Sequence, residues 1–264
     1  MKNSSTAPGS LSAKQVADYY QNGYLVVRGL IDPETVEFAK KSIDDYIIEH
    51  PTEVSYEPEI LKDRAPESMS VEERLMSVRG FHQKATKDER FAHLVKYQPL
   101  AEALVSFLGD DIKVVQDMAL IKPPHVGSEK PTHQDAAYFE LEPFDQVMGT
   151  WWALDAATVE NGCMFVWPGT HRLPVVEHLD QEGSPHKVIN PEFIDPSQQV
   201  ALPMNPGDVL FFSSRIFHFT PPNKSDHRRR SLQVHYGSAH CRVIPGMKAR
   251  KYTLVHGKSQ PHGF

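Results

Sequence analysis

The stretch IKVVQDMALIK, residues 112–122, marks the point at which the chain changes from helix-like to strand-like sequence. It is rich in β-branched and aliphatic residues, which favour a strand. Five similar stretches follow, separated by Pro, Gly, Asn and Asp: VMGTWWALD (147–155), CMFVWPG (163–169), QVALPM (199–204), DVLFFSS (208–214) and RSLQVHYGS (230–238). Helical segments followed by many short strands predict a β-barrel or β-sandwich core with helices packed outside it.

The residues before 112 carry the helix signals. Residues 12–23, 31–50 and 88–109 are predicted to be helical, the last as one helix or a pair that ends at Gly109. In the second of these, Asp32 is a good N-cap and Pro33 suits the first helical position. Its apolar stripe consists of Val36, Ala39, Ile43 and Ile47. We expect a strand at 24–30, irregular structure at 50–74 and a disordered N-terminus at 1–10.

The composition excludes several classes of protein. Of the 264 residues, 40% are apolar and 23% are charged, as in an ordinary globular protein. The formal net charge of −6 gives no general attraction to nucleic acid or to an anionic membrane. Only two cysteines are present, which implies no disulfide framework and a reducing compartment. Because no secretory signal or long apolar run is visible, we expect a cytoplasmic protein without nucleic-acid or membrane partners.

The motif PTHQDAAYF, residues 131–139, carries a candidate metal site. His133 and Asp135 are two positions apart, so on a strand their side chains point to one face and can converge on one metal ion. The spacing alone is weak evidence, because His178 and Asp180 repeat it. That second pair lies in the long polar insertion 171–198, which we interpret as a surface loop, so we reject it as a ligand pair.

A third ligand is predicted from a later strand, and His218 follows the most apolar strand of the chain. Two histidines and one carboxylate form the facial triad of non-haem Fe(II) oxygenases. Three arginines, Arg228 to Arg230, follow about ten residues later, and one buried guanidinium would hold a dicarboxylate such as 2-oxoglutarate. We interpret Arg228 and Arg230 as a solvated turn. By strand alternation, Ser231, Gln233 and His235 should face inward with Arg229, and Leu232 and Val234 outward.

Taken together, these stretches resemble the phytanoyl-CoA dioxygenase family, in particular its domain-containing proteins. The blocks that carry the resemblance are VVQDMALIKPPHVG, PTHQDAAYF, WWALDAATVENGCMFVWPGTH, PGDVLFF and HFTPPNKSDHRRRSLQVHY. The resemblance runs from about residue 15 to 245. It implies a mainly β fold with flanking helices and a double-stranded β-helix (jelly-roll, cupin-like) core. A single domain would cover 11–264, with a helical part at about 11–110 and the core at about 111–245.

The resemblance also implies roles for individual residues. His133, Asp135 and His218 would bind iron, and Arg229 would bind the far carboxylate of 2-oxoglutarate with support from the Thr220 hydroxyl. The remaining contacts to 2-oxoglutarate would come from Gln134, Trp151, Met118 and Arg79. His82 and Tyr138 would face the substrate, under a roof formed by 60–90, 122–131 and 171–198. Asn161–Gly162 and Gly207–Asp208 would be turns that shape the barrel.

The implied function is an Fe(II)- and 2-oxoglutarate-dependent dioxygenase. Such an enzyme uses O2 to hydroxylate an unactivated C–H bond of a small organic molecule, and 2-oxoglutarate becomes succinate and CO2. A small-molecule substrate is the expected partner, and the protein is expected to be a monomer or a homodimer. Two alternatives remain open at this point. One is a non-oxidative metalloenzyme on the same fold, and the other is a non-catalytic ligand-binding jelly-roll.

Overall fold

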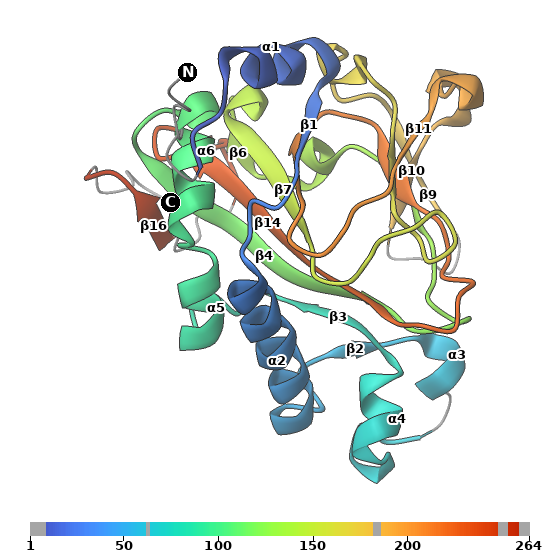
Figure 1. Ribbon diagram of the computed structural model, residues 1–264. Coiled ribbons are helices and arrows are strands. Elements are labelled where there is room, and N and C mark those ends of the chain that lie inside the picture. The colour runs from blue at the N-terminus through green and yellow to red at the C-terminus, as the bar shows by residue number, and fades with distance from the viewer. Residues whose placement is uncertain (1–8, 62–63, 182–185, 248–252, 259–264) are drawn as a thin grey trace, which may run out of the picture.

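Figure 1 shows a computed structural model of the protein, which describes residues 9–61, 64–181, 186–247 and 253–258. The segment predicted to be disordered, 1–10, lies outside the described residues except for Gly9 and Ser10. No described helix combines the length and the apolar character that crossing a membrane requires. The helices are α1 (Ala13–Asn22), α2 (Pro33–Glu49), α3 (Pro58–Leu61), α4 (Val71–Leu75), α5 (Glu89–Leu94) and α6 (Gln98–Leu108).

Two antiparallel sheets form the core. The larger one has the order β1 (Tyr24–Val27), β12 (Val209–Ser213), β7 (Val147–Ala153), β14 (Arg229–Ser238), β4 (Ile112–Lys122), β3 (Val78–His82) and β2 (Ser55–Tyr56), and β16 (Thr253–His256) also pairs with β4. The smaller one has the order β11 (Val200–Leu202), β8 (Met164–Val166), β13 (His218–Thr220) and β5 (Lys130–His133). Two short pairs lie outside them: β6 (Leu141–Glu142) with β15 (Arg242–Val243), and β9 (His178–Asp180) with β10 (Lys187–Ile189).

The helix signals in the sequence are confirmed. Asp32 caps α2 by accepting a hydrogen bond from the Thr35 backbone N–H at 2.8 Å, and Pro33 is its first residue. All four residues of the predicted stripe of α2 are buried. The segment 88–109 forms the pair α5 and α6, which ends at Gly109 with a positive φ of 78°.

Alternation along the strands gives the larger sheet two different faces. Trp152 and Val234 pack with the helices in the outer core, whereas Trp151 and Phe212 point toward the smaller sheet. In Figure 1, α5 and α6 lie on one side of β4 and β14, and β9 to β11 lie on the other. The mainly β fold with flanking helices and a double-stranded β-helix core is therefore confirmed. The space between the two sheets is the interior of the barrel.

Three local predictions are wrong. The segment 50–74 is not simply irregular, since it contains β2, α3 and most of α4. The insertion 171–198 contains the pair β9 and β10. Arg228 and Arg230 are not solvated, because both bind Asp44 of α2, and Arg230 also binds Asp155 through two nitrogens at 2.9 Å. Helix α2 packs beside this turn, and a single-segment pattern does not show a partner that lies so far away in sequence.

Candidate metal centre and co-substrate cavity

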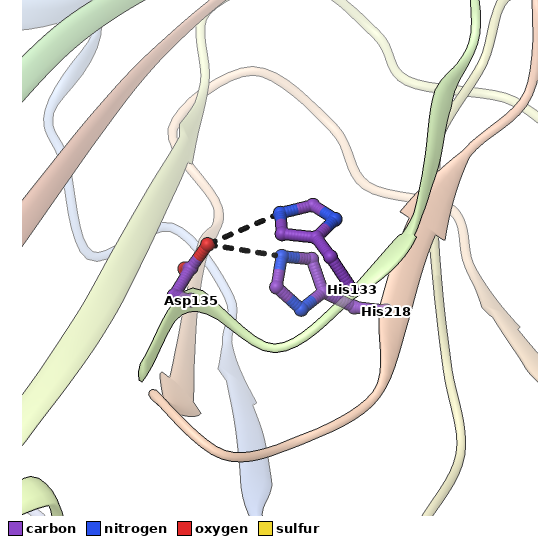
Figure 2. Close-up of side chains that lie close together, drawn as sticks. All are labelled: His133, Asp135 and His218. Carbon is purple, nitrogen blue, oxygen red and sulfur yellow. Dashed lines mark hydrogen bonds and ion pairs between the residues drawn. The ribbon is translucent and has the colours of Figure 1, made fainter. Parts of the chain in front are cut away.

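Three side chains suited to bind a metal meet between the two sheets: His133, Asp135 and His218. The histidines are neighbours across strands, since His218 of β13 pairs with His133 of β5. Asp135 Oδ1 lies 3.1 Å from His133 Nε2 and 3.6 Å from His218 Nε2, and Figure 2 shows both rings turned toward it. Ligands placed about 2.1 Å from an octahedral ion lie about 3 Å apart, so the spacing fits one metal ion.

Asp135 lies in a different secondary-structure element from the one predicted. Strand β5 ends at His133, and Asp135 opens the 3-10 turn Asp135–Tyr138. The expectation that His133 and Asp135 share one face of a strand is therefore wrong, although their side chains do converge. The Ala136 N–H donates to the Ser214 carbonyl at 2.8 Å, which ties this turn to the loop before His218.

Backbone carbonyls fix the protonation of both histidines. His133 Nδ1 donates to the Pro131 carbonyl at 2.7 Å, and His218 Nδ1 donates to the Ile216 carbonyl at 3.1 Å. A carbonyl only accepts, so each Nδ1 carries the proton and each Nε2 keeps its lone pair for a metal. Burial lowers the pKa of His218 to about 4. Burial opposes ionisation of Asp135, but the surrounding imidazoles of His218, His235 and His133 hold its pKa well below the usual range.

A third histidine, His235 of β14, supports Asp135 from the opposite side. Its Nε2 lies 2.7 Å from Asp135 Oδ2, and the Gln233 amide nitrogen lies 3.2 Å from the same ring atom. Phe139 packs edge-on against the ring at 4.8 Å between centroids. Because Oδ2 has this partner, Oδ1 is the oxygen that faces the metal site. The alternation of β14 had indicated that Gln233 and His235 point inward, but their contact with Asp135 was not foreseen.

We expect His235→Ala to weaken metal binding about 10- to 100-fold, because Asp135 would lose the contact that orients it. A competition titration with Mn(II) in the absence of 2-oxoglutarate measures this. Asp180→Ala is the matched control, since Asp180 belongs to the other His-x-Asp pair and its side chain is 87% exposed. That control should bind Mn(II) like the wild type. Unchanged Mn(II) affinity in His235→Ala would contradict the supporting role of His235.

The triad lies in the wall of a cavity of about 230 Å³ between the sheets. The larger sheet contributes Met118, Trp151 and Gln233, and the smaller sheet contributes Met164 and Thr220. Each of the three segments expected to form a roof supplies lining residues, namely Arg79, His82, Ser128, Lys130 and His186. One continuous cavity therefore connects the metal ligands with Arg229, which also lines it.

The surroundings of the Arg229 side chain favour the binding of an anion. Its side chain is only 2% exposed, and it donates to Ser231 Oγ at 2.9 Å and to the Gly162 carbonyl at 3.2 Å. Its Nε and the Thr220 hydroxyl are both buried, and neither has a hydrogen-bond partner among the described residues. Burial lowers the pKa of Arg229 to about 10, and no carboxylate of the described residues forms an ion pair with it. A buried cation in this state is costly unless a ligand compensates its charge.

Of the other residues predicted to contact 2-oxoglutarate, Trp151 and Met118 are near Arg229 or in the same cavity, and Gln134 is not. Trp151 and Met118 line the cavity, and the Trp151 ring lies 5.1 Å from the Arg229 guanidinium carbon. Gln134 does not line it. Its amide donates to the carbonyls of Pro174 and Arg215 and accepts from the Val176 N–H. Gln134 therefore anchors the loop after β8, and its assignment to 2-oxoglutarate is wrong.

The predicted substrate residues and the rejected pair also have clear positions. His82 and Tyr138 both line the cavity, and the Tyr138 hydroxyl bonds with the backbone of Lys187 at the start of β10. His178 lies on β9, not in an irregular surface loop, and accepts a hydrogen bond from the Gln134 N–H at 3.0 Å. Among the described residues, neither His178 nor Asp180 belongs to the metal-binding group, so their rejection as ligands agrees with the structure.

Turn residues shape this site as expected. Asn161 closes its turn by accepting from the Thr158 N–H at 2.8 Å and donating to the Ala156 carbonyl at 2.8 Å. Gly162 has a φ of +88°, and an added Cβ would lie 2.5 Å from the Pro221 carbonyl oxygen. Only glycine fits there without a shift of the backbone. The turn thus presents the Gly162 carbonyl to Arg229.

The sequence matches the phytanoyl-CoA dioxygenase (PhyH) family over residues 19–231, which is most of the chain. The chain belongs to the phytanoyl-CoA dioxygenase family. The resemblance seen in the sequence is confirmed, and the protein is a dioxygenase. The two alternatives, a non-oxidative metalloenzyme and a non-catalytic jelly-roll, are therefore set aside.

Relatives within the family are similar to this chain over most of their length. Rat peroxisomal phytanoyl-CoA dioxygenase is 27% identical over 260 residues, which cover 95% of this chain and 72% of the relative. Mouse phytanoyl-CoA dioxygenase domain-containing protein 1 is 26% identical over 261 residues, covering 85% and 89%. Among solved structures, SnoK, a non-haem α-ketoglutarate-dependent carbocyclase from nogalamycin biosynthesis, superposes with a TM-score of 0.72 at 22% identity, covering 95% of this chain and 98% of SnoK. At this identity the likeness shows the fold.

Phytanoyl-CoA dioxygenases use Fe(II) and 2-oxoglutarate, and the residues present fit both. For the metal, the fit rests on two neutral imidazoles and one carboxylate within bonding distance of a single ion. For 2-oxoglutarate, it rests on the buried Arg229 Nε and Thr220 hydroxyl. Neither has a partner in the part of the chain that the structure describes, and both residues line the cavity that holds the triad. Fe(II) is thus the cofactor of this dioxygenase and 2-oxoglutarate is its co-substrate.

Proposed function

We propose that this family member hydroxylates an unactivated C–H bond of a small organic molecule, with conversion of 2-oxoglutarate to succinate and CO2. One observation carries the proposal: a single cavity contains the triad, the buried Arg229 and additional space lined by apolar side chains. Asp135 supports hydroxylation in particular, since a carboxylate at this position fills the place that halide takes in related halogenases. The proposed binding residues are His133, Asp135 and His218 for iron, and Arg229, Thr220, Trp151 and Met118 for 2-oxoglutarate.

In the proposed reaction, separate residues would hold the iron, hold the co-substrate and exclude water. Fe(II), when bound by the triad, supplies the O2 activation and the oxidation of 2-oxoglutarate. Arg229 and Thr220 would hold the far carboxylate, which fixes the co-substrate in one orientation. Trp151 would keep the guanidinium in place by packing on it, and His235 would keep Oδ1 of Asp135 toward the metal. Phe139 and Met118 would exclude water around the reacting C–H bond.

Succinate release tests this function. The protein is loaded anaerobically with Fe(II) and 2-oxoglutarate, O2 and a panel of small organic molecules are added, and succinate is measured. We expect at least one compound to raise succinate release above the basal rate and to gain one oxygen atom from 18O2. Compounds that raise succinate release without gaining oxygen would contradict hydroxylation while leaving the dioxygenase assignment intact.

Cellular location and assembly remain predictions. We propose a cytoplasmic protein, on the basis of the cysteine count of two, and one that acts as a monomer or a homodimer. The rat relative is named as peroxisomal, so fractionation of cells that express the tagged protein is the relevant measurement. Co-sedimentation with peroxisomal markers would contradict the proposed location. Light scattering coupled to size exclusion measures the oligomeric state.

A further inference from the structure

A second group of basic side chains lines the cavity, separate from Arg229. Arg79 and His82 come from β3, Lys130 from β5, and His186 directly precedes β10. Lys130 Nζ lies 2.9 Å from His186 Nε2. Among the described residues, no carboxylate forms a salt bridge with Arg79 or Lys130. Three segments that are distant in sequence thus bring basic side chains to one place beside the metal site.

Desolvation and the neighbouring positive charges lower the pKa values of the members of this group. Burial lowers the pKa of Lys130 to about 8, and the charge of Arg79 contributes to the shift. Burial together with the charges of Lys130 and Arg79 lowers the pKa of His186 to about 4, and partial desolvation with the same two charges lowers the pKa of His82. A cluster of this kind loses free energy of solvation on burial, and a bound anion would restore it.

The charge of the whole cavity also favours an anion. Among the described residues that line it, two are negatively charged, Glu57 and Asp135. Three are positively charged: Arg79, Lys130 and Arg229. Lys122 also lines it, but burial lowers its pKa to about 6, so it counts as neutral at pH 7. One positive charge is therefore left over. Fe(II) adds two positive charges and 2-oxoglutarate removes two, so the excess persists when both are bound.

We propose that Lys130 binds a carboxylate of the substrate, and that the substrate is an organic acid with an apolar body. This inference rests on the proposed function. Lys130 precedes His133 by three residues on β5, about 10 Å along the strand, so the body of the acid and not its carboxylate would face the metal. Leu120, Phe139 and Phe219 line the cavity and suit such a body.

Binding measurements can test this without turnover. The protein is loaded with Mn(II) and saturating 2-oxoglutarate, and calorimetry measures its affinity for octanoate, octanamide, phenylacetate and phenylacetamide. We expect at least one acid to bind about 10- to 100-fold more tightly than its amide, as one charge-assisted contact provides. Lys130→Met should abolish this preference, and Lys130→Arg should retain most of it. The affinity for 2-oxoglutarate should stay unchanged in both variants.

Lys187→Met is the matched control, because the Lys187 side chain is half exposed on β10 and does not line the cavity. It should keep the preference for the acid. The inference is overturned if neither acid binds better than its amide, or if Lys130→Met keeps the preference. It is also overturned if octanoyl-CoA, whose carboxyl is masked, binds tightly and depends equally on Lys130, since phosphates would then occupy the site. Failure of the wild type to bind 2-oxoglutarate at all would instead contradict the proposed function and remove the basis of this inference.

Discussion

Asp135→Ala is expected to lose turnover by about three orders of magnitude or more, the scale seen when one member of a catalytic unit is removed. Two causes act together. The metal would keep only the two histidines as ligands, and His235 would lose the carboxylate that its Nε2 contacts at 2.7 Å. Succinate release with saturating Fe(II) and 2-oxoglutarate measures the loss. Mn(II) titration of the same variant should show weakened metal binding.

The control for this variant comes from the same sequence. Asp180 occupies the equivalent position of the second His-x-Asp pair, and Asp180→Ala should keep wild-type turnover because no described metal-binding group includes it. A thermal unfolding curve of Asp135→Ala distinguishes loss of the site from loss of the fold. A folded Asp135→Ala variant with near wild-type succinate release would overturn the triad assignment.

Arg229→Ala should raise the 2-oxoglutarate concentration needed for half-maximal turnover by roughly two to three orders of magnitude. Removing one partner of a buried ion pair costs about 3–5 kcal/mol, and about 1.4 kcal/mol corresponds to tenfold in affinity. Thr220→Val should have a smaller effect of about tenfold, because it removes one hydrogen bond to the carboxylate but no positive charge. The apparent affinity for 2-oxoglutarate, measured by succinate release and by calorimetry with Mn(II), decides both.

Arg228→Ala is the control for Arg229→Ala. Arg228 is the preceding residue, but it binds Asp44 of α2 on the outer side of the sheet and does not line the cavity. Its loss should change the 2-oxoglutarate affinity by less than about tenfold, although it removes an ion pair. Retained Mn(II) binding in Arg229→Ala would show that the triad is still folded. An unchanged 2-oxoglutarate affinity in that variant would exclude Arg229 as the carboxylate ligand.

Local periodicity accounts for what could be predicted from the sequence. The expected strand 112–122 is β4, and the two-residue alternation of β14 correctly separated inward Arg229, Gln233 and His235 from outward Leu232 and Val234. The same reasoning found the buried stripe of α2 and its cap at Asp32. Each of these features depends on neighbours within a few residues along the chain, where backbone geometry alone fixes which side chains share a face.

The tertiary structure decided everything that depends on distant partners. It placed Asp135 in a turn instead of on a strand, and it paired His133 with His218 across β5 and β13. It also turned Gln134 toward the loop carbonyls and gathered Lys130, Arg79 and His186 from three segments. The sequence by itself determined the main helices, the strands of the core and the family, because local pattern and motif order encode them. Which side chains meet around the cavity follows from sheet pairing and loop packing, since those contacts join residues that are tens of positions apart.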